Sequence, residues 1–291
     1  MMMKKSKVIA VVGATASGKS SYAIDLAQKL DGEIVSADSR LVYKGLDIGT
    51  AKPSKEERAL IPHYMIDIVE PEINYSAGLY AQEAKKCIDY ILSRGKVPII
   101  TGGTGLYLRI LLENYNLPQT EPDYELRKNL SELSFIDLYK ILRDLDPEAA
   151  NLVNENDKRR AIRFIEVIKQ TNIPLSKARG FKQNEYSVEW IGLNYPREEL
   201  YDRINRRVDM MIEQGLVDET KHLLEKHGRI SNIVDTIGYK EMILYLDGIL
   251  SLPQAVDKLK QNTRNYAKRQ LTWFRKNPEI KWNCYPERKK K

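Results

Sequence analysis

The sequence predicts an α/β protein in which helices cover both faces of a parallel sheet and a further, all-helical segment is inserted. Two observations predict this arrangement. Over the first third of the chain, short β-branched runs alternate with helical stretches, which is the pattern of βαβ units with right-handed connections. From Pro118 to about Ala178, by contrast, the sequence shows helical periodicity alone. We therefore expect a core of residues 1–117 and 186–291 and an all-helical insertion domain at 118–185.

The first part of the core is expected to alternate strands with helices. The strands are short apolar runs, rich in β-branched residues, at 7–12, 33–36 and 97–101. The helices, at 19–30 and 77–94, carry apolar residues at a helical period and lie between these strands. Because parallel strands need such crossover connections, we expect these strands to form one parallel sheet.

The insertion and the last part of the chain are expected to be mainly helical. Within the insertion, apolar residues recur at three- and four-residue spacings. They are Leu138, Ile141, Leu142, Leu145, Ile162, Ile165 and Ile168. A short strand at 189–193 then returns the chain to the sheet, and C-terminal helices begin near Arg197.

The chain has the composition of a globular protein, since 42% of its 291 residues are apolar and 30% are charged. It has 2 cysteines, Cys87 and Cys284, which argues against a disulfide framework or a Cys-rich zinc cluster and fits a reducing compartment. No apolar run approaches the roughly 18 residues of a membrane span. We therefore expect a cytoplasmic protein that makes no membrane contact.

Residues 13–20 form the most specific motif. Their sequence, GATASGKS, matches the phosphate-binding pattern G-x-x-x-x-G-K-[ST] between a predicted strand and a predicted helix, so the fold is expected to be P-loop NTPase-like. Backbone N–H groups would bind phosphate, Lys19 would add a mobile cation and Ser20 would bind Mg²⁺. The expected diphosphate- or nucleotide-binding residues are Gly13, Ala14, Thr15, Ala16, Ser17, Gly18, Lys19 and Ser20. This motif predicts a phosphorylated ligand and leaves the reaction open.

Two further loops follow predicted strands, at residues 36–40 and 102–105. The carboxyl ends of parallel strands meet at one edge of a sheet, so we expect both loops to face the phosphate loop. Asp38 can serve there as a general base, a metal partner or a helix cap, and its place beside a phosphate site favours catalysis. Thr104 can be a turn residue, but its hydroxyl can also hydrogen-bond a phosphate or the reacting amine, which we favour.

One aspartate allows two interpretations, and the three histidines are expected to have no role in the site. Asp67 is equally consistent with the acidic strand end that holds Mg²⁺ through water in P-loop NTPases and with a solvated aspartate. His63, His222 and His227 have no ligand-like companions in the sequence, and we expect them to be surface or packing residues.

The chain carries a net charge of +7, and two segments concentrate it. Residues 258–276 are rich in Lys and Arg, contain no Asp or Glu, and include Tyr266, Trp273 and Phe274. This segment can be an ordinary amphipathic helix, or it can bind RNA phosphates and stack an unpaired base on an aromatic ring. Its candidate phosphate contacts are Arg264, Lys268, Arg269 and Arg275. With a second basic cluster at 158–163, it favours a large RNA over a small metabolite.

Several ordered motifs besides GATASGKS resemble those of the tRNA dimethylallyltransferase (tRNA isopentenyltransferase) family of bacterial type. The resemblance extends from Lys7 to about Trp282. It rests on SADSRLVYKGLDIGTAKP (36–53), HYMIDI (63–68), IITGGTGLYL (99–108), NDKRRAIRFIEV (156–167), LYDRINRRVDMMIEQGLVDE (200–219), DTIGYKE (235–241) and TRNYAKRQLTWFR (263–275).

The resemblance implies transfer of a dimethylallyl group from dimethylallyl diphosphate to the N6 amine of the adenosine 3′ of the anticodon in tRNA, with Mg²⁺ as cofactor. The phosphate loop would then hold the diphosphate of the donor. Lys19, Asp38 and Thr104 would be the catalytic residues, with Asp38 as the general base. Arg203 and Arg206 match the family's basic RIxxR segment, and one of them is expected to bind diphosphate.

The resemblance also implies which residues touch tRNA. They are Asp38, Ser39, Arg40, Leu41 and Thr104 beside the phosphate loop, Arg159, Arg160, Ala161, Ile162 and Arg163 in the insertion, and Arg264, Lys268 and Arg269 near the end. Together they would hold the anticodon stem-loop. Leu41 departs from the family pattern, in which Gln is frequent at this position. The tail also lacks the zinc-binding extension of eukaryotic relatives, so no zinc is expected.

The sequence leaves three other functions open. An adenylate (free-nucleotide) isopentenyltransferase would share the phosphate loop and the catalytic carboxylate, but the basic clusters and the insertion favour tRNA. A small-molecule or nucleoside kinase would account for GATASGKS but not for GGTGLY or the basic aromatic segment. A non-enzymatic RNA-binding ATPase would hydrolyse nucleotide and leave no modified base. We expect an enzyme that acts as a monomer and needs no protein partner.

Overall fold

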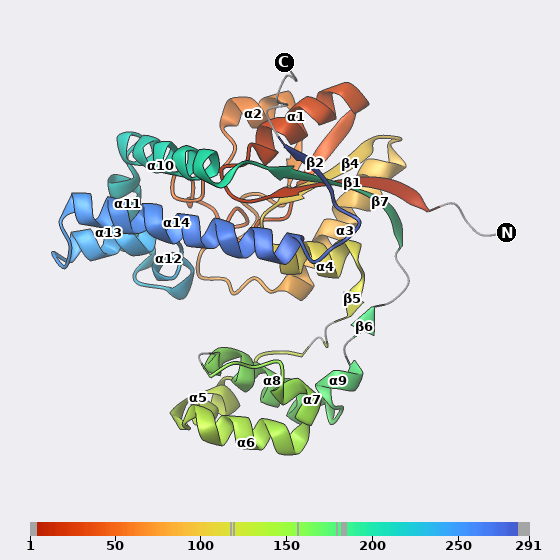
Figure 1. Ribbon diagram of the computed structural model, residues 1–291, viewed down its shortest axis with the longest axis vertical. Coiled ribbons are helices and arrows are strands. Elements are labelled where there is room, and N and C mark those ends of the chain that lie inside the picture. The colour runs from red at the N-terminus through yellow and green to blue at the C-terminus, as the bar shows by residue number, and fades with distance from the viewer. Residues whose placement is uncertain are drawn as a thin grey trace. The chain divides into compact units, whose positions relative to one another are not determined.

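The computed structural model describes residues 5–116, 118, 120–155, 157–178, 180–181 and 185–284. The chain folds into two compact units (Figure 1). The first comprises the chain up to Leu112 and again from Glu185, and the second spans Glu113–Asn184. Within the described ranges, no helix is both long and apolar enough to cross a membrane.

Among the described residues, a six-stranded sheet in the order β3-β2-β4-β1-β7-β8 forms the centre of the first unit. Every pair of neighbouring strands is parallel, which confirms the predicted α/β class. The edge strand β8 was not predicted, and the strand expected to end at Asp67 ends instead at Tyr64, because such short strands carry little periodic pattern. The strands are β1 (Ser6–Gly13), β2 (Gly32–Ser36), β3 (His63–Tyr64), β4 (Val97–Gly102), β7 (Tyr186–Asn194) and β8 (Lys281–Cys284).

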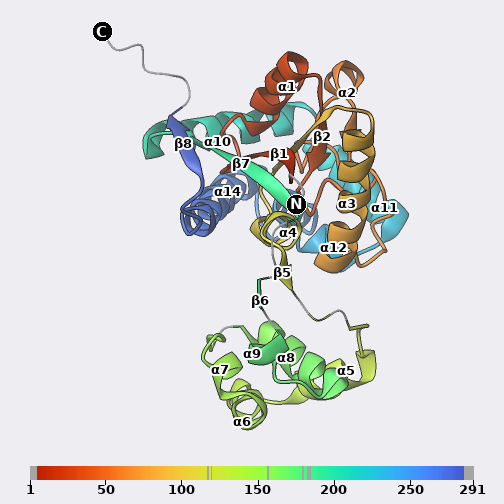
Figure 2. The ribbon, with the colours of Figure 1, turned by 90° about the vertical axis from the view of Figure 1, so that its right-hand side faces the viewer.

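Helices cover both faces of this sheet: α1 (Lys19–Leu30) lies on one side, and α3 (Ala77–Ser93) and α4 (Gly105–Leu112) lie on the other (Figures 1 and 2). Successive side chains of β1 point to opposite faces, as in any strand. Ile9 therefore packs with apolar residues of α1, and Ala10 packs with those of α3 and α4. Both side chains are almost fully buried, so β1 lies in the middle of the core and holds the loop at its carboxyl end in place.

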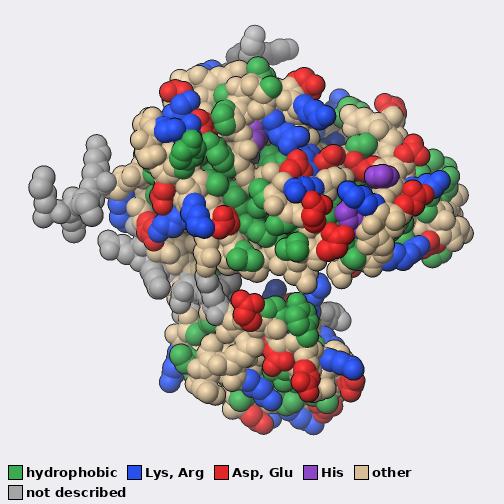
Figure 3. All heavy atoms as spheres, turned by 180° about the vertical axis from the view of Figure 1, so that it is seen from behind, with side chains coloured by type: hydrophobic (Ala, Val, Ile, Leu, Met, Phe, Trp, Pro, Cys, Tyr) green, Lys and Arg blue, Asp and Glu red, His purple; other side chains and the backbone are tan. Residues whose placement is uncertain are grey.

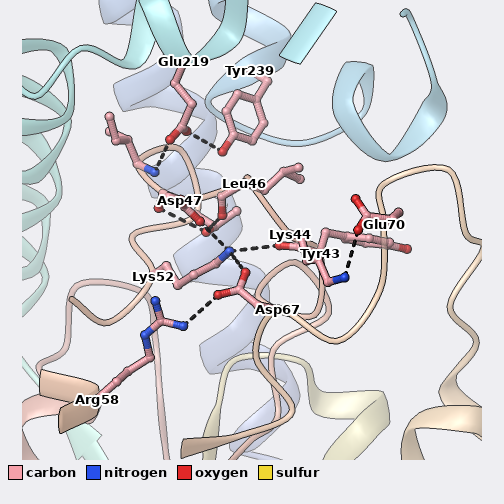
Figure 4. A network of polar contacts seen from close by, with 12 residues as sticks. Tyr43, Lys44, Leu46, Asp47, Lys52, Arg58, Asp67, Glu70, Glu219 and Tyr239 are labelled. Carbon is pink, nitrogen blue, oxygen red and sulfur yellow. Dashed lines mark hydrogen bonds and ion pairs between the residues drawn. The ribbon is translucent and has the colours of Figure 1, made fainter. Parts of the chain in front are cut away.

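The loop after β2 packs against the C-terminal helices of the first unit. Leu46 of this loop is fully buried in their apolar core. Glu219 fixes the same loop, because it accepts hydrogen bonds from the Ile48 N–H at 2.8 Å, the Gly49 N–H at 3.0 Å and the Tyr239 hydroxyl at 2.7 Å (Figure 4). The remaining helices of this unit are α2 (Lys55–Leu60), α10 (Arg197–Glu213), α11 (Leu216–His227), α12 (Ser231–Val234), α13 (Tyr239–Leu246) and α14 (Leu252–Phe274).

The second unit contains a two-stranded antiparallel ribbon, β5 with β6, in addition to the helices predicted there. Its apolar core includes Leu138 and Ile165. Glu166 is buried beside this core, where it accepts a hydrogen bond from Arg127 at 2.8 Å and pairs with Arg163. Burial would raise the pKa of Glu166, but these arginines outweigh it and lower the pKa. The elements are β5 (Tyr115–Asn116), α5 (Tyr124–Glu132), α6 (Phe135–Leu145), α7 (Pro147–Ala150), α8 (Lys158–Thr171), α9 (Leu175–Ala178) and β6 (Gly180–Phe181).

Candidate functional site

The phosphate loop joins β1 to the N-terminus of α1. Gly18 precedes α1 with a φ of +80°, a conformation that favours glycine, and no side chain caps the helix. The first N–H groups of α1 are therefore not used by a side-chain cap and are suited to bind an anion. Lys19 donates from Nζ to the Ala14 carbonyl at 3.0 Å, so its ammonium group lies along the loop. Ser20 is exposed at the start of α1.

The loops after β2 and β4 are hydrogen-bonded to each other. The Thr104 N–H donates to the Ala37 carbonyl at 3.1 Å, and Thr104 Oγ1 accepts the Ser39 N–H at 2.9 Å. Asp38 lies between these two contacts, and its Oδ1 accepts the Arg40 N–H at 2.9 Å. The structure therefore brings Asp38 and Thr104 together, because β2 and β4 are neighbours in the sheet.

Lys19, Asp38 and Arg207 share one electrostatic environment. Burial and the positive charge of Arg207 lower the pKa of Lys19 to about 8, and the Asp38 carboxylate opposes this shift. Burial also lowers the pKa of Arg207, and Asp38 again acts in the opposite direction. Charges shift one another's pKa in this way only at short range. The phosphate loop and the Asp38 loop therefore face one site, in which positive charge is in excess.

Helix α10 directs two arginines toward this site. Arg203 donates from Nε to the Ala16 carbonyl at 2.8 Å, and its guanidinium lies 4.7 Å from the centroid of the Tyr195 ring. Arg207 follows one turn later on the same face, whereas Arg206 is exposed. Sequence reasoning named Arg206 and missed Arg207. The signal was present, because Arg207 stands four residues after Arg203 and is the second arginine of RIxxR.

Three tyrosines, the buried Tyr80 and Tyr107 and the half-buried Tyr266, are affected by the charge of Asp38. Burial raises the pKa of Tyr80, Tyr107 and Tyr266, and the negative charge of Asp38 adds to each shift. The rings of Tyr80 and Tyr107 are stacked, with centroids 3.9 Å apart. These phenols stay protonated at neutral pH and are therefore not proton acceptors there. Tyr80 and Tyr107 were not singled out from the sequence, because nothing in their spacing distinguishes them from core residues.

Both carboxylate oxygens of Asp67 are engaged in ion pairs (Figure 4). One pairs with Lys52, and the other accepts a hydrogen bond from Arg58 at 2.7 Å. The Lys52 side chain is only 3% exposed and also contacts Asp47 and the Tyr43 carbonyl, at 2.5 and 2.9 Å. Asp67 is therefore neither a solvated residue nor an unpaired metal ligand, and its contacts fix the chain after β2.

The histidines lie in other surroundings. His63 Nδ1 is 2.7 Å from the Ile61 carbonyl, His227 Nδ1 is 2.6 Å from a Glu72 oxygen, and His222 is exposed. In the part of the chain that the structure describes, no group of three or more His, Cys, Asp or Glu side chains could hold a metal ion. A metal ion at this site would therefore be coordinated mostly by water and by oxygen atoms of a bound phosphorylated substrate.

Helix α14 presents a groove with basic and aromatic walls. Its lining residues are Asn265, Lys268, Arg269, Thr272, Trp273 and Lys276. Lys268 and Arg269 are exposed, whereas Arg264 is half-buried and donates to Asn205 at 2.8 Å. On the face of the molecule seen in Figure 3, by contrast, positive and negative side chains are interspersed. The groove on α14 is therefore the better candidate for binding a polyanion.

The basic stretch of the second unit is only partly exposed. Arg159 and Arg160 are exposed, and Arg160 pairs with Asp157 at 3.2 Å. The Ala161 side chain is fully buried and Ile162 packs against the core of this unit, so neither side chain presents charge to a ligand. Arg163 pairs with the buried Glu166. The charge available to RNA in this stretch thus comes mainly from Arg159 and Arg160.

Three comparisons relate the chain to known proteins. A profile of the IPP transferase family matches residues 41–277. A tRNA dimethylallyltransferase from Pelotomaculum thermopropionicum is 45% identical over 286 residues, which cover 96% of this chain and 91% of the relative. The crystal structure of the full-length tRNA isopentenylpyrophosphate transferase from Bacillus halodurans is 42% identical, with a TM-score of 0.72 over 97% of this chain and 90% of that one. A structure of a eukaryotic dimethylallyltransferase acting on tRNA is 31% identical, with a TM-score of 0.81 over 92% of this chain and 70% of that one.

Proposed function

The chain belongs to the tRNA dimethylallyltransferase family, and we propose that it transfers a dimethylallyl group from dimethylallyl diphosphate to the N6 amine of the adenosine 3′ of the anticodon in tRNA. A bond forms between N6 and C1 of the dimethylallyl group, the C1–oxygen bond breaks, diphosphate leaves and N6 loses a proton. The observation that supports the proposal is that β1, β4 and β2 are neighbours in the sheet, so that the phosphate loop, Thr104 and Asp38 follow the carboxyl ends of adjacent strands. The effect of the Asp38 carboxylate on the pKa of Lys19 agrees with this.

Asp38 is the general base of this reaction. The exocyclic amine of adenine is a poor nucleophile, because its lone pair is delocalised into the ring. An ionised carboxylate that accepts the amine proton during attack therefore accelerates the step. Thr104 lies beside Asp38 through its contact with Ser39, and its hydroxyl is suited to orient the amine or a diphosphate oxygen.

Cations at the phosphate loop stabilise the leaving group. Diphosphate gains negative charge as the C1–oxygen bond breaks, and donors fixed in advance around that charge lower the barrier. Lys19 and the N–H groups at the start of α1 contact the diphosphate in this proposal. Arg207 adds charge from α10, while Arg203 supports the loop through the Ala16 carbonyl.

Mg²⁺ fits the residues present. This ion prefers oxygen ligands, keeps several waters and needs few protein groups when it binds together with phosphates. Ser20 is exposed at the start of α1, and Asp38 faces the same site, whereas both oxygens of Asp67 are already paired. When bound, Mg²⁺ would neutralise part of the charge that develops on diphosphate.

The RNA is held by basic surfaces outside the catalytic site. The groove on α14 offers Lys268 and Arg269 to phosphates and Trp273 to an unstacked base. The target adenosine must leave its stack to reach Asp38, which is easier in a loop than in a duplex. Ser39 and Arg40 lie in the same loop as Asp38. The exposed Arg159 and Arg160 of the second unit are further candidate RNA contacts. As part of the proposal, the enzyme acts on cytoplasmic tRNA as a monomer.

The test is incubation of the protein with dimethylallyl diphosphate, Mg²⁺ and unmodified tRNA, followed by mass spectrometry of the nucleosides. We expect a prenylated adenosine, which Asp38→Asn reduces by at least about 100-fold because the proton acceptor is lost. Asp25→Asn is the matched control, since Asp25 is an exposed aspartate on α1. Full activity of Asp38→Asn would remove the assignment of the base.

The same incubation, repeated with added adenosine monophosphate, or with ATP and a small phosphate acceptor, separates the rival functions. Prenylation of free adenosine monophosphate, with tRNA left unmodified, would identify an adenylate isopentenyltransferase. Phosphorylation of a small substrate by ATP would identify a kinase. ATP hydrolysis without any modified base would identify an RNA-binding ATPase.

A further inference from the structure

One buried amide joins the two sides of the site. Gln270 of α14 is 5% exposed. Its Oε1 accepts the Thr15 N–H at 2.8 Å, and its Nε2 donates to the Gly103 carbonyl at 3.0 Å. Thr15 belongs to the phosphate loop, whereas Gly103 immediately precedes Thr104. A single side chain therefore bridges the backbone of the leaving-group loop and the backbone of the loop beside the base.

We propose that Gln270 is a positioning residue that sets the separation between the phosphate loop and the paired loops of Asp38 and Thr104. The inference rests on the proposed function. In a displacement reaction the nucleophile, the carbon and the leaving group must be aligned at bonding distance, and a misplacement of about 1 Å can lower the rate by about 100-fold. A fixed bridge between the loops supplies this alignment before the substrates bind.

The bridge needs both ends of an amide. The Thr15 N–H requires an acceptor and the Gly103 carbonyl requires a donor, and the glutamine side chain provides both on one planar group. Glutamate keeps the acceptor and, when ionised, has no donor for the carbonyl. Methionine keeps the unbranched length and has neither an N–H donor nor a strong acceptor. The bridge also occupies the Thr15 N–H, which leaves phosphate binding to later amides of the loop.

Close packing keeps the bridge in place. A Cβ atom added to Gly103 would lie 2.0 Å from Gln270 Nε2, and one added to Gly105 would lie 2.1 Å from Trp273 Nε1. Neither glycine has an unusual φ, so the space taken by α14 side chains favours glycine at both positions: Gly105 faces the rigid Trp273 ring and Gly103 faces the Gln270 amide. Helix α14 therefore packs directly against the GGTG loop, and the Gln270 amide fills the space beside Gly103.

The experiment compares Gln270→Met and Gln270→Glu with the wild-type enzyme in the dimethylallyl transfer assay. Both substitutions keep the side-chain length, which favours a folded product. The control is Gln261→Met, because Gln261 is exposed on the same helix. The concentration of competent enzyme is taken from calorimetric titration with inorganic diphosphate and Mg²⁺. We expect kcat per diphosphate-binding site to fall by at least about tenfold in both Gln270 variants, while KM for tRNA stays within about twofold.

A purely structural role would give a different result. It would lower the melting temperature and the number of diphosphate-binding sites, and it would leave kcat per site unchanged. Either Gln270 variant with wild-type kcat per site would overturn the inference, as would an equal loss in Gln261→Met. If the wild-type enzyme prenylates tRNA and the Gln270 variants keep its kcat per site, this inference alone is overturned. If the wild-type enzyme prenylates no tRNA, the proposed function is overturned as well.

Discussion

The Arg203 guanidinium donates from Nε to the carbonyl of Ala16 at 2.8 Å. Ala16 has a φ of +62°, which is uncommon for a residue with a Cβ. The hydrogen bond ties this strained peptide to a helix 187 residues away in the sequence. The conformation of the phosphate loop is therefore set by side chains outside the loop as well as by its glycines.

Replacement of Arg207 is expected to impair the reaction more than replacement of Arg206. We expect Arg207→Met to lower kcat/KM for dimethylallyl diphosphate by about 100-fold, because a half-buried cation that acts on Lys19 is lost from the leaving-group side. Arg206→Met is expected to stay within about twofold, since Arg206 is exposed. Steady-state kinetics of tRNA prenylation measures both. The reverse order of effects would assign diphosphate binding to Arg206, as the sequence reasoning allowed.

Affinity for diphosphate is expected to weaken above about pH 8. In the free protein, burial and Arg207 lower the pKa of Lys19 to about 8, and the charge of bound diphosphate raises it. Binding is therefore linked to the charged form of Lys19. Affinity is complete below pH 8 and falls by up to about tenfold for each pH unit above it, until the pKa of the complex is reached. Calorimetric titration with inorganic diphosphate and Mg²⁺ between pH 7 and pH 10 measures this.

Lys19→Arg is the control for this pH dependence, because a guanidinium stays charged over the whole range. This variant is expected to bind diphosphate with little change between pH 7 and pH 10. If it loses affinity as steeply as the wild-type protein, the titrating group is not Lys19.

Asp67→Asn is expected to affect stability and not the requirement for Mg²⁺. The substitution removes the charge that pairs with the buried Lys52, so we expect the free energy of unfolding to fall by about 1–3 kcal/mol. The Mg²⁺ concentration that gives half-maximal activity is expected to stay within about twofold. Glu70→Gln, which breaks the exposed pair with Lys44, is the control and should change stability by less than about 1 kcal/mol. A clear rise in the Mg²⁺ requirement of Asp67→Asn would instead make Asp67 part of a metal site.

The central part of the site could be predicted because it depends on local sequence and strand order. Lys19 lies in a motif with a fixed conformation, and Asp38 and Thr104 each follow a buried strand. Since the carboxyl ends of parallel strands share one edge of the sheet, placing these residues together needed no knowledge of distant contacts.

The remaining features depend on contacts that no local pattern reveals. Gln270 bonds to Thr15 across 255 residues and resembles any polar residue of an amphipathic helix. The pairing of Asp67 with Lys52 likewise depends on how a loop folds back on itself. Arg207 is different, because the helical period alone puts it on the same face of α10 as Arg203, which is not so for Arg206. Counting from Arg203 along one face of the helix would have found it.

The contact between Thr15 and Gln270 also has a consequence for protein synthesis. A ribosome makes the phosphate loop before α14, which follows it by more than 200 residues in the sequence. A nascent or prematurely terminated chain therefore has a phosphate loop without its glutamine bridge. Until α14 has been made, nothing of this bridge sets the distance between the phosphate loop and the loop of Thr104, so the alignment that the reaction needs is completed only late in synthesis.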